Sequence, residues 1–299
     1  MRIITENDIE SLKISPKTCV QWVKEALLIK PECQLPAKVH VHPQGNDFIT
    51  TMPCLLTPET ATFGVKVVSR INGRKPALKS NIMLYDSVEG DMKAVIDANW
   101  ITSMRTGAMA TLAIRTLRKP DTKVYSLMGL GSIARATMTC MLHEFEEEHL
   151  QVRLLRYKDQ AERFAEEYSN YANVTFTIVD TIEEWATDSD VIISAITDAQ
   201  GLIVEDLNLF KPGVLVVPVH MRGFQNCDRV FDKVFGDDYG HICGFKYFSE
   251  FKSFNEIGDV LMGKAEGRMN NQERILSYNY GLGLHDVYYA MKIMEKLMA

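Results

Sequence analysis

A glycine turn near the middle of the chain constrains the fold more than any other sequence feature. The run from Val124 to Met128 is apolar and typical of a strand, and Ile133 begins a run typical of a helix. Gly129 and Gly131 stand between them. A strand, a glycine turn and a helix in this order form a dinucleotide-binding pattern. The first glycine permits the tight turn, and the second lets a pyrophosphate reach the helix N-terminus. Taken alone, the pattern fits a purely structural turn equally well.

Composition places the chain among globular proteins and argues against several other classes. The 299 residues are 46% hydrophobic and 24% charged, and this length predicts two domains. The net charge of -6, with no Lys/Arg cluster, argues against a nucleic-acid or anionic-membrane partner. The six cysteines have neither CxxC nor zinc spacing, which predicts reduced thiols, a cytoplasmic protein and no metal site. Neither a signal-peptide pattern nor a membrane-spanning apolar run is found.

The first third of the chain is predicted to be rich in strands. Ser15 and Pro16 supply the N-cap and first turn of an early helix. Alternating or apolar runs between Pro, Gly, Asn and Asp residues then predict several strands, and a helix is expected from Thr102 to Leu117. The expected strands lie at 2–4, 39–41, 48–52, 62–68, 80–85 and 92–96.

After a break at 119–121, strands and helices alternate. Continuous apolar runs at 191–195 and 214–219 are typical of a parallel sheet that is covered on both faces. A last helix is expected from Leu282 to Leu297 and is predicted to pack on the first domain. The sequence therefore predicts an α/β protein with a Rossmann doubly wound sheet at 119–279. A β-rich α+β domain would be formed by 1–118 plus 280–299.

Two cationic residues in the first domain are candidates for a binding site. Lys66 lies in an apolar strand, where it shares a face with Gly64 and Val68. Because lysine is rarely buried without a partner, this position indicates either a functional lysine or an edge strand with a solvated face. Arg105 stands at the start of a helix, where its guanidinium fits a carboxylate or a phosphate. A surface salt bridge is the alternative for Arg105.

The end of the strand that follows the glycine turn indicates which nicotinamide cofactor binds. An acidic residue at this place normally accepts the ribose 2′-hydroxyl of NAD. Here the strand ends at Leu155 and is followed by Arg156 and Lys158. Because these cations suit a 2′-phosphate, we expect NADP(H) in preference to NAD(H), which stays possible. The alternative is that both cations are ordinary surface residues.

Two loops after apolar strands are expected to line the ligand crevice, because such loops do so in doubly wound sheets. Ser194, Ala195 and Thr197 offer small residues for a turn near the nicotinamide. His220 follows the next strand and is a candidate general acid/base, since imidazole titrates near neutral pH. A structural histidine is the alternative.

Six motifs, taken in order, resemble the ornithine cyclodeaminase/μ-crystallin family. The resemblance covers nearly the whole chain, and the lysine strand together with the Arg-Thr-Gly-Ala segment is its most specific part. The motifs are Gly64-Val-Lys-Val-Val68, Leu84-Tyr-Asp-Ser-Val-Glu-Gly90, Ile101-Thr-Ser-Met-Arg-Thr-Gly-Ala108, Gly129-Leu-Gly-Ser-Ile-Ala134, Asn255-Glu-Ile-Gly-Asp259 and Tyr280-Gly-Leu-Gly-Leu-His-Asp286.

The resemblance implies a homodimer in which the β-rich domain serves substrate binding and dimerisation. It implies that Lys66 and Arg105 bind a substrate carboxylate, with Lys38 where the family usually has arginine. Lysine keeps the charge there but loses the bidentate fork. By the same resemblance, Ser132, Ile133 and Ala134 would lie against the pyrophosphate, next to Gly129 and Gly131 of the glycine turn, and Arg156 and Lys158 would lie against the adenosine ribose. Asn279 occupies the usual place of a serine that faces the nicotinamide.

One departure from the family pattern bears on the reaction. Cyclodeaminases of the family carry Gly-Ala-Asp after the strand that ends near Val219, and that aspartate handles a proton and the attacking amine. This chain has His220-Met-Arg222 there, so no carboxylate stands at that place.

Three functions are consistent with these residues. The first is an NADP(H)-dependent oxidoreductase that acts on a small amino or imino acid, with Lys38, Lys66 and Arg105 on the carboxylate and His220 and Lys66 as catalytic residues. The second is an ornithine cyclodeaminase that forms proline and recycles NAD within one turnover. The third is an NADP-dependent small-molecule binder of μ-crystallin type, without turnover.

Overall fold

The computed structural model describes residues 1–197 and 199–298, which form two compact units. Unit 1 comprises Met1–Arg105 and Leu282–Ala299, and unit 2 comprises Thr106–Gly281. The boundary after Arg105 falls inside helix α3 (Asn99–Leu117), so this helix belongs to both units. In the described part of the chain, no helix is both long and apolar enough to cross a membrane.

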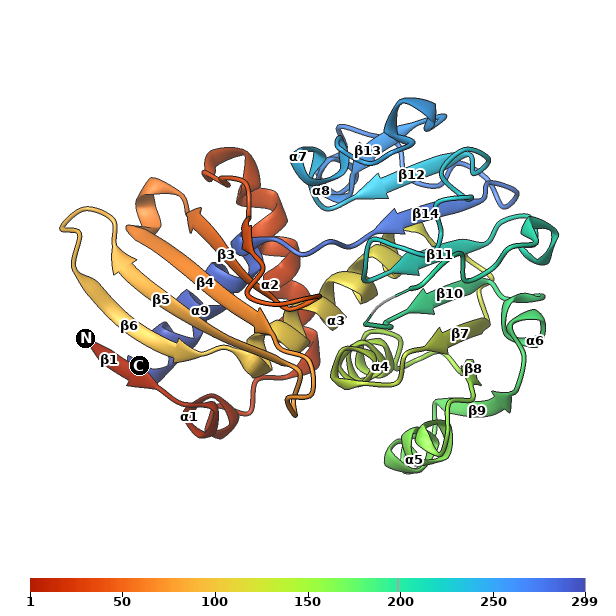
Figure 1. The fold of residues 1–299 in the computed structure, drawn as a ribbon, viewed down its shortest axis with the longest axis horizontal. Helices are drawn as coiled ribbons and strands as arrows, with labels where there is room; N and C mark the ends of the chain where they lie inside the picture. The colour runs from red at the N-terminus through yellow and green to blue at the C-terminus, as the bar shows by residue number, and fades with distance from the viewer. Residues whose placement is uncertain (198, 299) are drawn as a thin grey trace. The chain divides into compact units, whose positions relative to one another are not determined.

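Unit 1 is built on a six-stranded mixed sheet with the strand order β1-β6-β5-β4-β3-β2 (Figure 1). All neighbours pair antiparallel except β1 and β6, which pair parallel. The expected strands are confirmed, with small differences at their ends. They are β1 (Arg2–Ile4), β2 (Val39–Val41), β3 (Phe48–Leu55), β4 (Thr62–Arg70), β5 (Leu78–Asp86) and β6 (Met92–Asp97).

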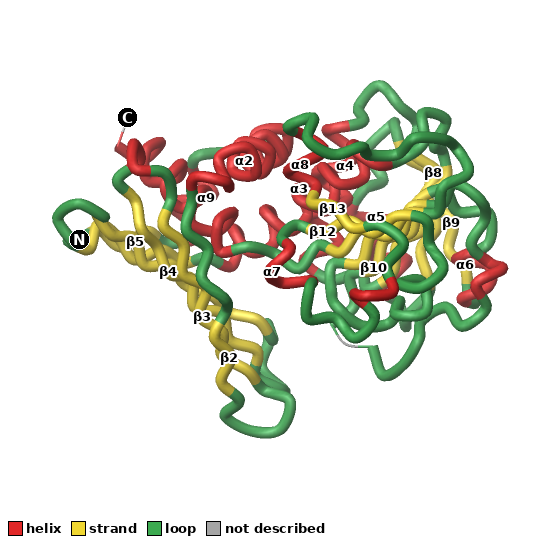
Figure 2. The backbone as a smooth tube through the Cα atoms, turned by 90° about the horizontal axis from the view of Figure 1, so that it is seen from above, coloured by secondary structure: helices red, strands yellow, loops and turns green. Residues whose placement is uncertain are grey.

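Helices cover one face of this sheet. Helix α2 (Pro16–Ile29) begins as expected, because Ser15 accepts a hydrogen bond from the Thr18 amide and proline takes the first turn. Helix α9 (Gly283–Met298) packs on β3, β4 and β5 and also on α2. The two helices lie on the same side of the strands (Figure 2). The last helix therefore returns to the first unit, as predicted; α1 (Glu6–Ser11) precedes α2.

Unit 2 contains an eight-stranded parallel sheet with the order β13-β12-β14-β11-β10-β7-β8-β9 (Figure 1). Every residue of β10, β11 and β14 is buried, as expected for parallel strands covered on both faces. The Rossmann-type doubly wound sheet is therefore confirmed. Its strands are β7 (Val124–Met128), β8 (Leu150–Leu155), β9 (Val174–Val179), β10 (Val191–Ser194), β11 (Leu215–Pro218), β12 (Lys233–Gly236), β13 (Phe254–Glu256) and β14 (Ile275–Tyr278).

Three short strands of this sheet had no counterpart in the sequence analysis. β12, β13 and β14 contain only three or four residues each. Runs of this length give too little periodicity to separate a strand from a loop, and tertiary pairing decides their conformation. The helices of unit 2 after α3 are α4 (Ser132–Glu144), α5 (Gln160–Glu167), α6 (Ile182–Ala186), α7 (Tyr239–Ile242) and α8 (Ile257–Leu261).

Gly64 sets the distance between β4 and α9. A Cβ atom at this position would lie 2.7 Å from Cγ2 and 2.9 Å from Cγ1 of Val287. We therefore expect Gly64→Ala to push α9 away from the sheet and to lower the free energy of unfolding by about 1–3 kcal/mol, the usual cost of overpacking a core. Urea unfolding measures this difference.

Gly244→Ala is the matched control for this substitution. A Cβ atom there has no neighbour within 4 Å, so its effect should stay within about 0.5 kcal/mol. Equal unfolding midpoints for Gly64→Ala and Gly244→Ala would contradict the close approach of α9.

Candidate functional site

Lys66 is buried in the middle of the sheet of unit 1. Residues of β4 alternate between buried and half-buried, which places Lys66 on the same face as Gly64 and Val68, as predicted. β4 pairs with β3 on one side and β5 on the other, so the edge-strand alternative is wrong. The side chain of Lys66 is only 1% exposed. A charge in this position needs a partner, because desolvation of an isolated ammonium is costly.

The partner is Asp286, in the first turn of α9. Its Oδ1 lies 2.9 Å from Nζ of Lys66 and 3.0 Å from Nε of Arg105. Asp286 is fully buried, while the side chain of Arg105 keeps 8% exposure. Two predicted cations, 39 positions apart in the sequence, are therefore brought together by one carboxylate that the prediction missed. The surface-salt-bridge alternative for Arg105 is wrong, because this ion pair is buried.

A signal for Asp286 was present in the sequence. It lies in an apolar helix, in a motif already quoted for the family, and Lys66 required an anion. An aspartate in a first helical turn is, however, also favoured by the helix dipole, which gives it an ordinary explanation. Only the fold brings residue 286 to residue 66.

Burial and the neighbouring charges both shift the pKa values in this cluster. Burial and the charge of Arg105 lower the pKa of Lys66 to about 7, while Asp286 raises it. Burial alone would raise the pKa of Asp286, but Arg105 and Lys66 outweigh it and hold that pKa below its ordinary value. Lys38 is half-buried and its charge also lowers the pKa of Lys66, so it acts on the same cluster. The cluster thus carries more positive than negative charge.

In unit 2 the glycine turn has a geometry that suits a phosphate. Gly129 has φ +77°, and a Cβ atom on it would overlap the backbone of Ala195 and Ile196. Gly131 is the N-cap of α4 and supplies no side-chain cap. A Cβ atom on Gly131 would approach no protein atom closer than 4.0 Å. The amides of the first turn of α4, at Ser132, Ile133 and Ala134, therefore begin a helix beside open space, where an anion is favoured.

The basic strand end also lies where it was predicted, but with additional partners. Arg156 follows β8 directly, and its Nε lies 2.5 Å from Oδ1 of Asp180. Its guanidinium also pairs with Glu162. Lys158 is exposed and has φ +54°. The sequence analysis did not foresee the two carboxylates, because they come from later elements.

The predicted loop residues of unit 2 meet at the carboxyl edge of the sheet. Ser194 ends β10 beside Pro218 of β11, and Oγ of Ser194 lies 2.6 Å from Nε2 of His220. The amide of Asn279, after β14, donates to the Pro218 carbonyl at 3.2 Å. The amide of Ala195 donates to the Met128 carbonyl, directly before the glycine turn. Thr197 is exposed on the same loop as Ala195.

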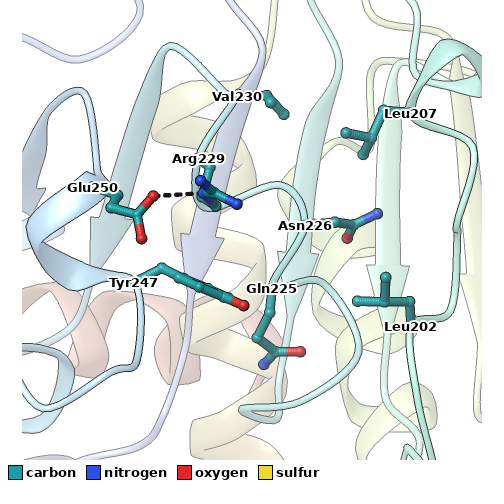
Figure 3. Close-up of a pocket in the computed structure, with 8 residues that line it drawn as sticks. All are labelled: Leu202, Leu207, Gln225, Asn226, Arg229, Val230, Tyr247 and Glu250. Atoms are coloured by element: carbon teal, nitrogen blue, oxygen red, sulfur yellow. Dashed lines mark hydrogen bonds and ion pairs between the residues drawn. The ribbon is translucent and has the colours of Figure 1, made fainter.

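A pocket elsewhere in unit 2 does not have the character of a reactive site. It has a volume of about 680 Å³ and is lined by eight residues (Figure 3). Arg229 faces Glu250 across it, with Nε 2.5 Å from Oε2. Asn226 donates to the Val204 carbonyl and Gln225 to that of Met221. Four of its polar side chains, Arg229, Glu250, Asn226 and Gln225, are thus already bonded to protein groups. Among the described residues, no cluster of His, Cys, Asp and Glu could hold a metal ion.

Comparison with known proteins identifies the family. The model of the ornithine cyclodeaminase/mu-crystallin family matches residues 2–299. The structure of Thermococcus litoralis Δ1-pyrroline-2-carboxylate reductase, in complex with NADH and L-proline, has a TM-score of 0.86 and 25% identity, covering 100% of this chain and 98% of the other.

Two further proteins show the same likeness. An archaeal alanine dehydrogenase dimer with bound NAD has a TM-score of 0.85 and 21% identity, with coverage of 100% and 96%. The ketimine reductase mu-crystallin of Rattus norvegicus is 27% identical over 223 residues, which are 73% of this chain and 67% of the relative. The chain therefore belongs to the ornithine cyclodeaminase/mu-crystallin family.

Proposed function

We propose that this protein is a cytoplasmic NAD(P)-dependent oxidoreductase that acts on a small amino or imino acid, of the amino-acid dehydrogenase or ketimine reductase type. The observation that carries the proposal is the buried pair of Lys66 and Arg105, which share the single carboxylate of Asp286. Two cations and one anion leave an excess positive charge, which suits one substrate carboxylate. The pyrrolinecarboxylate reductase, alanine dehydrogenase and ketimine reductase are related enzymes whose names fit this substrate class.

In the proposed reaction, the cations of unit 1 orient the substrate. Arg105 is the more exposed of the two and presents its guanidinium to the carboxylate, with Lys66 behind it. Lys38 adds a third positive charge. When bound, the nicotinamide supplies or accepts the hydride at the carbon next to the carboxylate. Fixing the carboxylate limits the positions that this carbon can take, which is how such a clamp raises the rate.

His220 is proposed to move the proton that accompanies hydride transfer. Its Nε2 is hydrogen-bonded to Ser194, so the Ser194 hydroxyl orients the ring. Phe224 stacks against the imidazole with 6.3 Å between ring centroids. An imidazole held in this way at the carboxyl edge of the sheet can donate or accept a proton near neutral pH.

The turnover of Δ1-pyrroline-2-carboxylate with NADH or NADPH tests this function. We expect net consumption of the reduced nucleotide with formation of proline. Arg105→Met should raise KM by about tenfold to hundredfold, the worth of a charged hydrogen bond. His220→Ala should lower kcat by about a hundredfold or more, the usual contribution of general acid–base catalysis. Initial rates over a range of substrate concentrations separate the two effects.

Arg229→Met is the control for Arg105→Met, because Arg229 is also ion-paired but lies in the pocket of Figure 3. It should leave KM and kcat unchanged. Formation of ammonia and proline from ornithine without net change in the nucleotide would instead establish a cyclodeaminase. Binding of imino acids without turnover would establish a small-molecule binder. A wild-type kcat in His220→Ala would remove that residue from the mechanism.

We propose NADP(H) as the preferred cofactor, with the pyrophosphate at the first turn of α4. Two features support NADP(H) binding at this place. The helix start at Gly131 has no side-chain cap, and the cations Arg156 and Lys158 follow β8. Arg156 would exchange its contacts with Asp180 and Glu162 for the 2′-phosphate. Such an exchange costs little, because exposed ion pairs contribute about 0–1 kcal/mol.

Arg156→Ala separates the two cofactors. It should raise the Kd of NADPH by about tenfold or more, since it removes a charged hydrogen bond to the phosphate. The Kd of NADH, which lacks this phosphate, should stay within about threefold, and fluorescence titration measures both. Arg163→Ala is the control, because Arg163 is exposed and pairs with Asp159 nearby. An equal effect on both nucleotides would contradict the preference for NADP(H).

We further propose that the protein is a homodimer formed through the face of the unit 1 sheet that points away from α2 and α9. β2, β3, β4 and β5 present half-buried or exposed apolar side chains on this face, and Val39 and Val41 are 59% and 53% exposed. Contiguous apolar surface of this kind marks interaction sites. The alanine dehydrogenase relative is described as a dimer. The residues on this face include Ile49, Pro53, Leu55, Phe63, Val65, Val67, Met83 and Tyr85.

Val65→Glu tests the dimer. A carboxylate in the middle of this face would be desolvated on association, so we expect a monomer by light scattering where the wild type is a dimer. Lys24→Glu also introduces a carboxylate, but on the exposed side of α2, and should leave the dimer intact. A Val65→Glu variant that stays dimeric would exclude this face as the interface.

A further inference from the structure

Asp286 holds both cations of unit 1 through the same oxygen. Oδ1 lies 2.9 Å from Nζ of Lys66 and 3.0 Å from Nε of Arg105. Lys66 lies in β4, Arg105 in α3 and Asp286 in α9. Asp286 is 220 positions from Lys66 and 181 positions from Arg105 in the sequence. Two cations that contact the same oxygen repel each other, and burial strengthens the repulsion. The anion between them is what keeps them together.

Asp286 is too deeply buried to reach a substrate. It has no exposed surface, and Oδ2 is covered by protein and has no hydrogen-bond partner among the described residues. A ligand at the surface of unit 1 meets Arg105 first, because Arg105 is the only one of the three with side-chain exposure above 1%. Any effect of Asp286 on a substrate is therefore transmitted by Lys66 and Arg105.

We propose that Asp286 is the positioning residue that holds Lys66 and Arg105 as a pair for the substrate carboxylate, an inference that rests on the carboxylate-binding role proposed above for the two cations. The negative charge of Asp286 sets the net charge of the site. With Lys66 and Arg105 protonated, the three groups carry a net charge of one positive unit, which matches one carboxylate. Its place in the first turn of α9 fixes the geometry, because the close packing of α9 on β4 fixes where Oδ1 lies.

The groups around Lys66 determine how the site responds to pH. Burial lowers the pKa of His285 to about 3, and burial raises the pKa of Cys54, so both are neutral near pH 7. Arg105 and Lys38 carry charges that lower the pKa of Lys66, and Asp286 is the group that raises it. Removing the charge of Asp286 therefore lowers the pKa of Lys66 further, and the lysine loses its proton at lower pH.

The first test is Asp286→Asn, which keeps the shape and removes the charge. With Δ1-pyrroline-2-carboxylate as substrate, we expect KM at pH 6.5, where Lys66 with its pKa of about 7 is still mostly charged in the wild type, to rise about tenfold, because Lys66 has lost its proton in the variant and Arg105 is no longer held. The value of kcat should change by less than about threefold, since Asp286 does not touch the reacting atoms. Lowering the pH should bring KM back toward the wild-type value, as Lys66 regains its proton. A purely structural role would not produce this recovery.

The second test combines Asp286→Asn with Lys66→Met. Lys66→Met alone leaves Arg105 neutralised by Asp286, so it should bind the substrate carboxylate poorly. The double variant again has one net positive charge, carried by Arg105, and KM should be lower than in Lys66→Met. Asp286→Asn would thus be harmful in the wild type and beneficial in Lys66→Met. Because the double variant removes both members of the Lys66–Asp286 pair, it does not leave Lys66 buried without its partner, and we expect it to fold where Asp286→Asn alone unfolds.

Glu295→Gln is the control, because Glu295 lies on the same helix and pairs with Lys292 at 3.3 Å on the surface. It should leave KM and its pH dependence unchanged. An Asp286→Asn enzyme with wild-type KM at pH 6.5, or a double variant with a higher KM than Lys66→Met, would overturn the role of Asp286. A wild-type protein that neither binds nor turns over imino acids would overturn the proposed function instead.

Discussion

Burying Lys66 in the middle of a sheet is the constraint on which unit 1 depends. An ammonium with 1% exposure is tolerated only with an opposite charge in contact, and removing one partner of a buried pair typically costs about 3–5 kcal/mol. Asp286 meets this requirement from α9, so the C-terminal helix has to return to the first sheet. The ion pair between Lys66 and Asp286 therefore requires that α9 packs on β3, β4 and β5.

Unit 2 depends on a different property, the common direction of its strands. Because β7, β10, β11 and β14 are parallel neighbours, their carboxyl ends share one edge. Ser194 ends β10, and the glycine turn, His220 and Asn279 come after β7, β11 and β14, so all of them lie along that edge. No side-chain attraction is needed to gather them, and the contact between Ser194 and His220 orients groups that topology has already brought together.

The difference between the two units explains what could be predicted from the sequence. The face on which Lys66 lies follows from the period of two in β4, and the gathering of Ser194 with His220 follows from a general rule for parallel sheets. Asp286 could not be placed in the same way, because its partner stands 220 positions earlier and no local pattern encodes that distance. The carboxylates around Arg156 were missed for the same reason. Strands such as β13, with three residues, carry too little pattern to be recognised.

The histidine at residue 220 bears on which reaction the family fold performs here. A carboxylate at such a place carries a negative charge near pH 7 and attracts a second amino group of a substrate as a cation. Imidazole has no negative charge in either state, so it offers no such attraction, but it can exchange one proton near neutral pH. Reduction of an imine by hydride transfer needs one proton for the nitrogen and no second amino group in the substrate. Deamination with ring closure needs groups that bind and move protons on both amino groups of the substrate. The residue at 220 thus favours net reduction, and the excess positive charge of the Lys66, Arg105 and Asp286 cluster favours a substrate that carries one carboxylate.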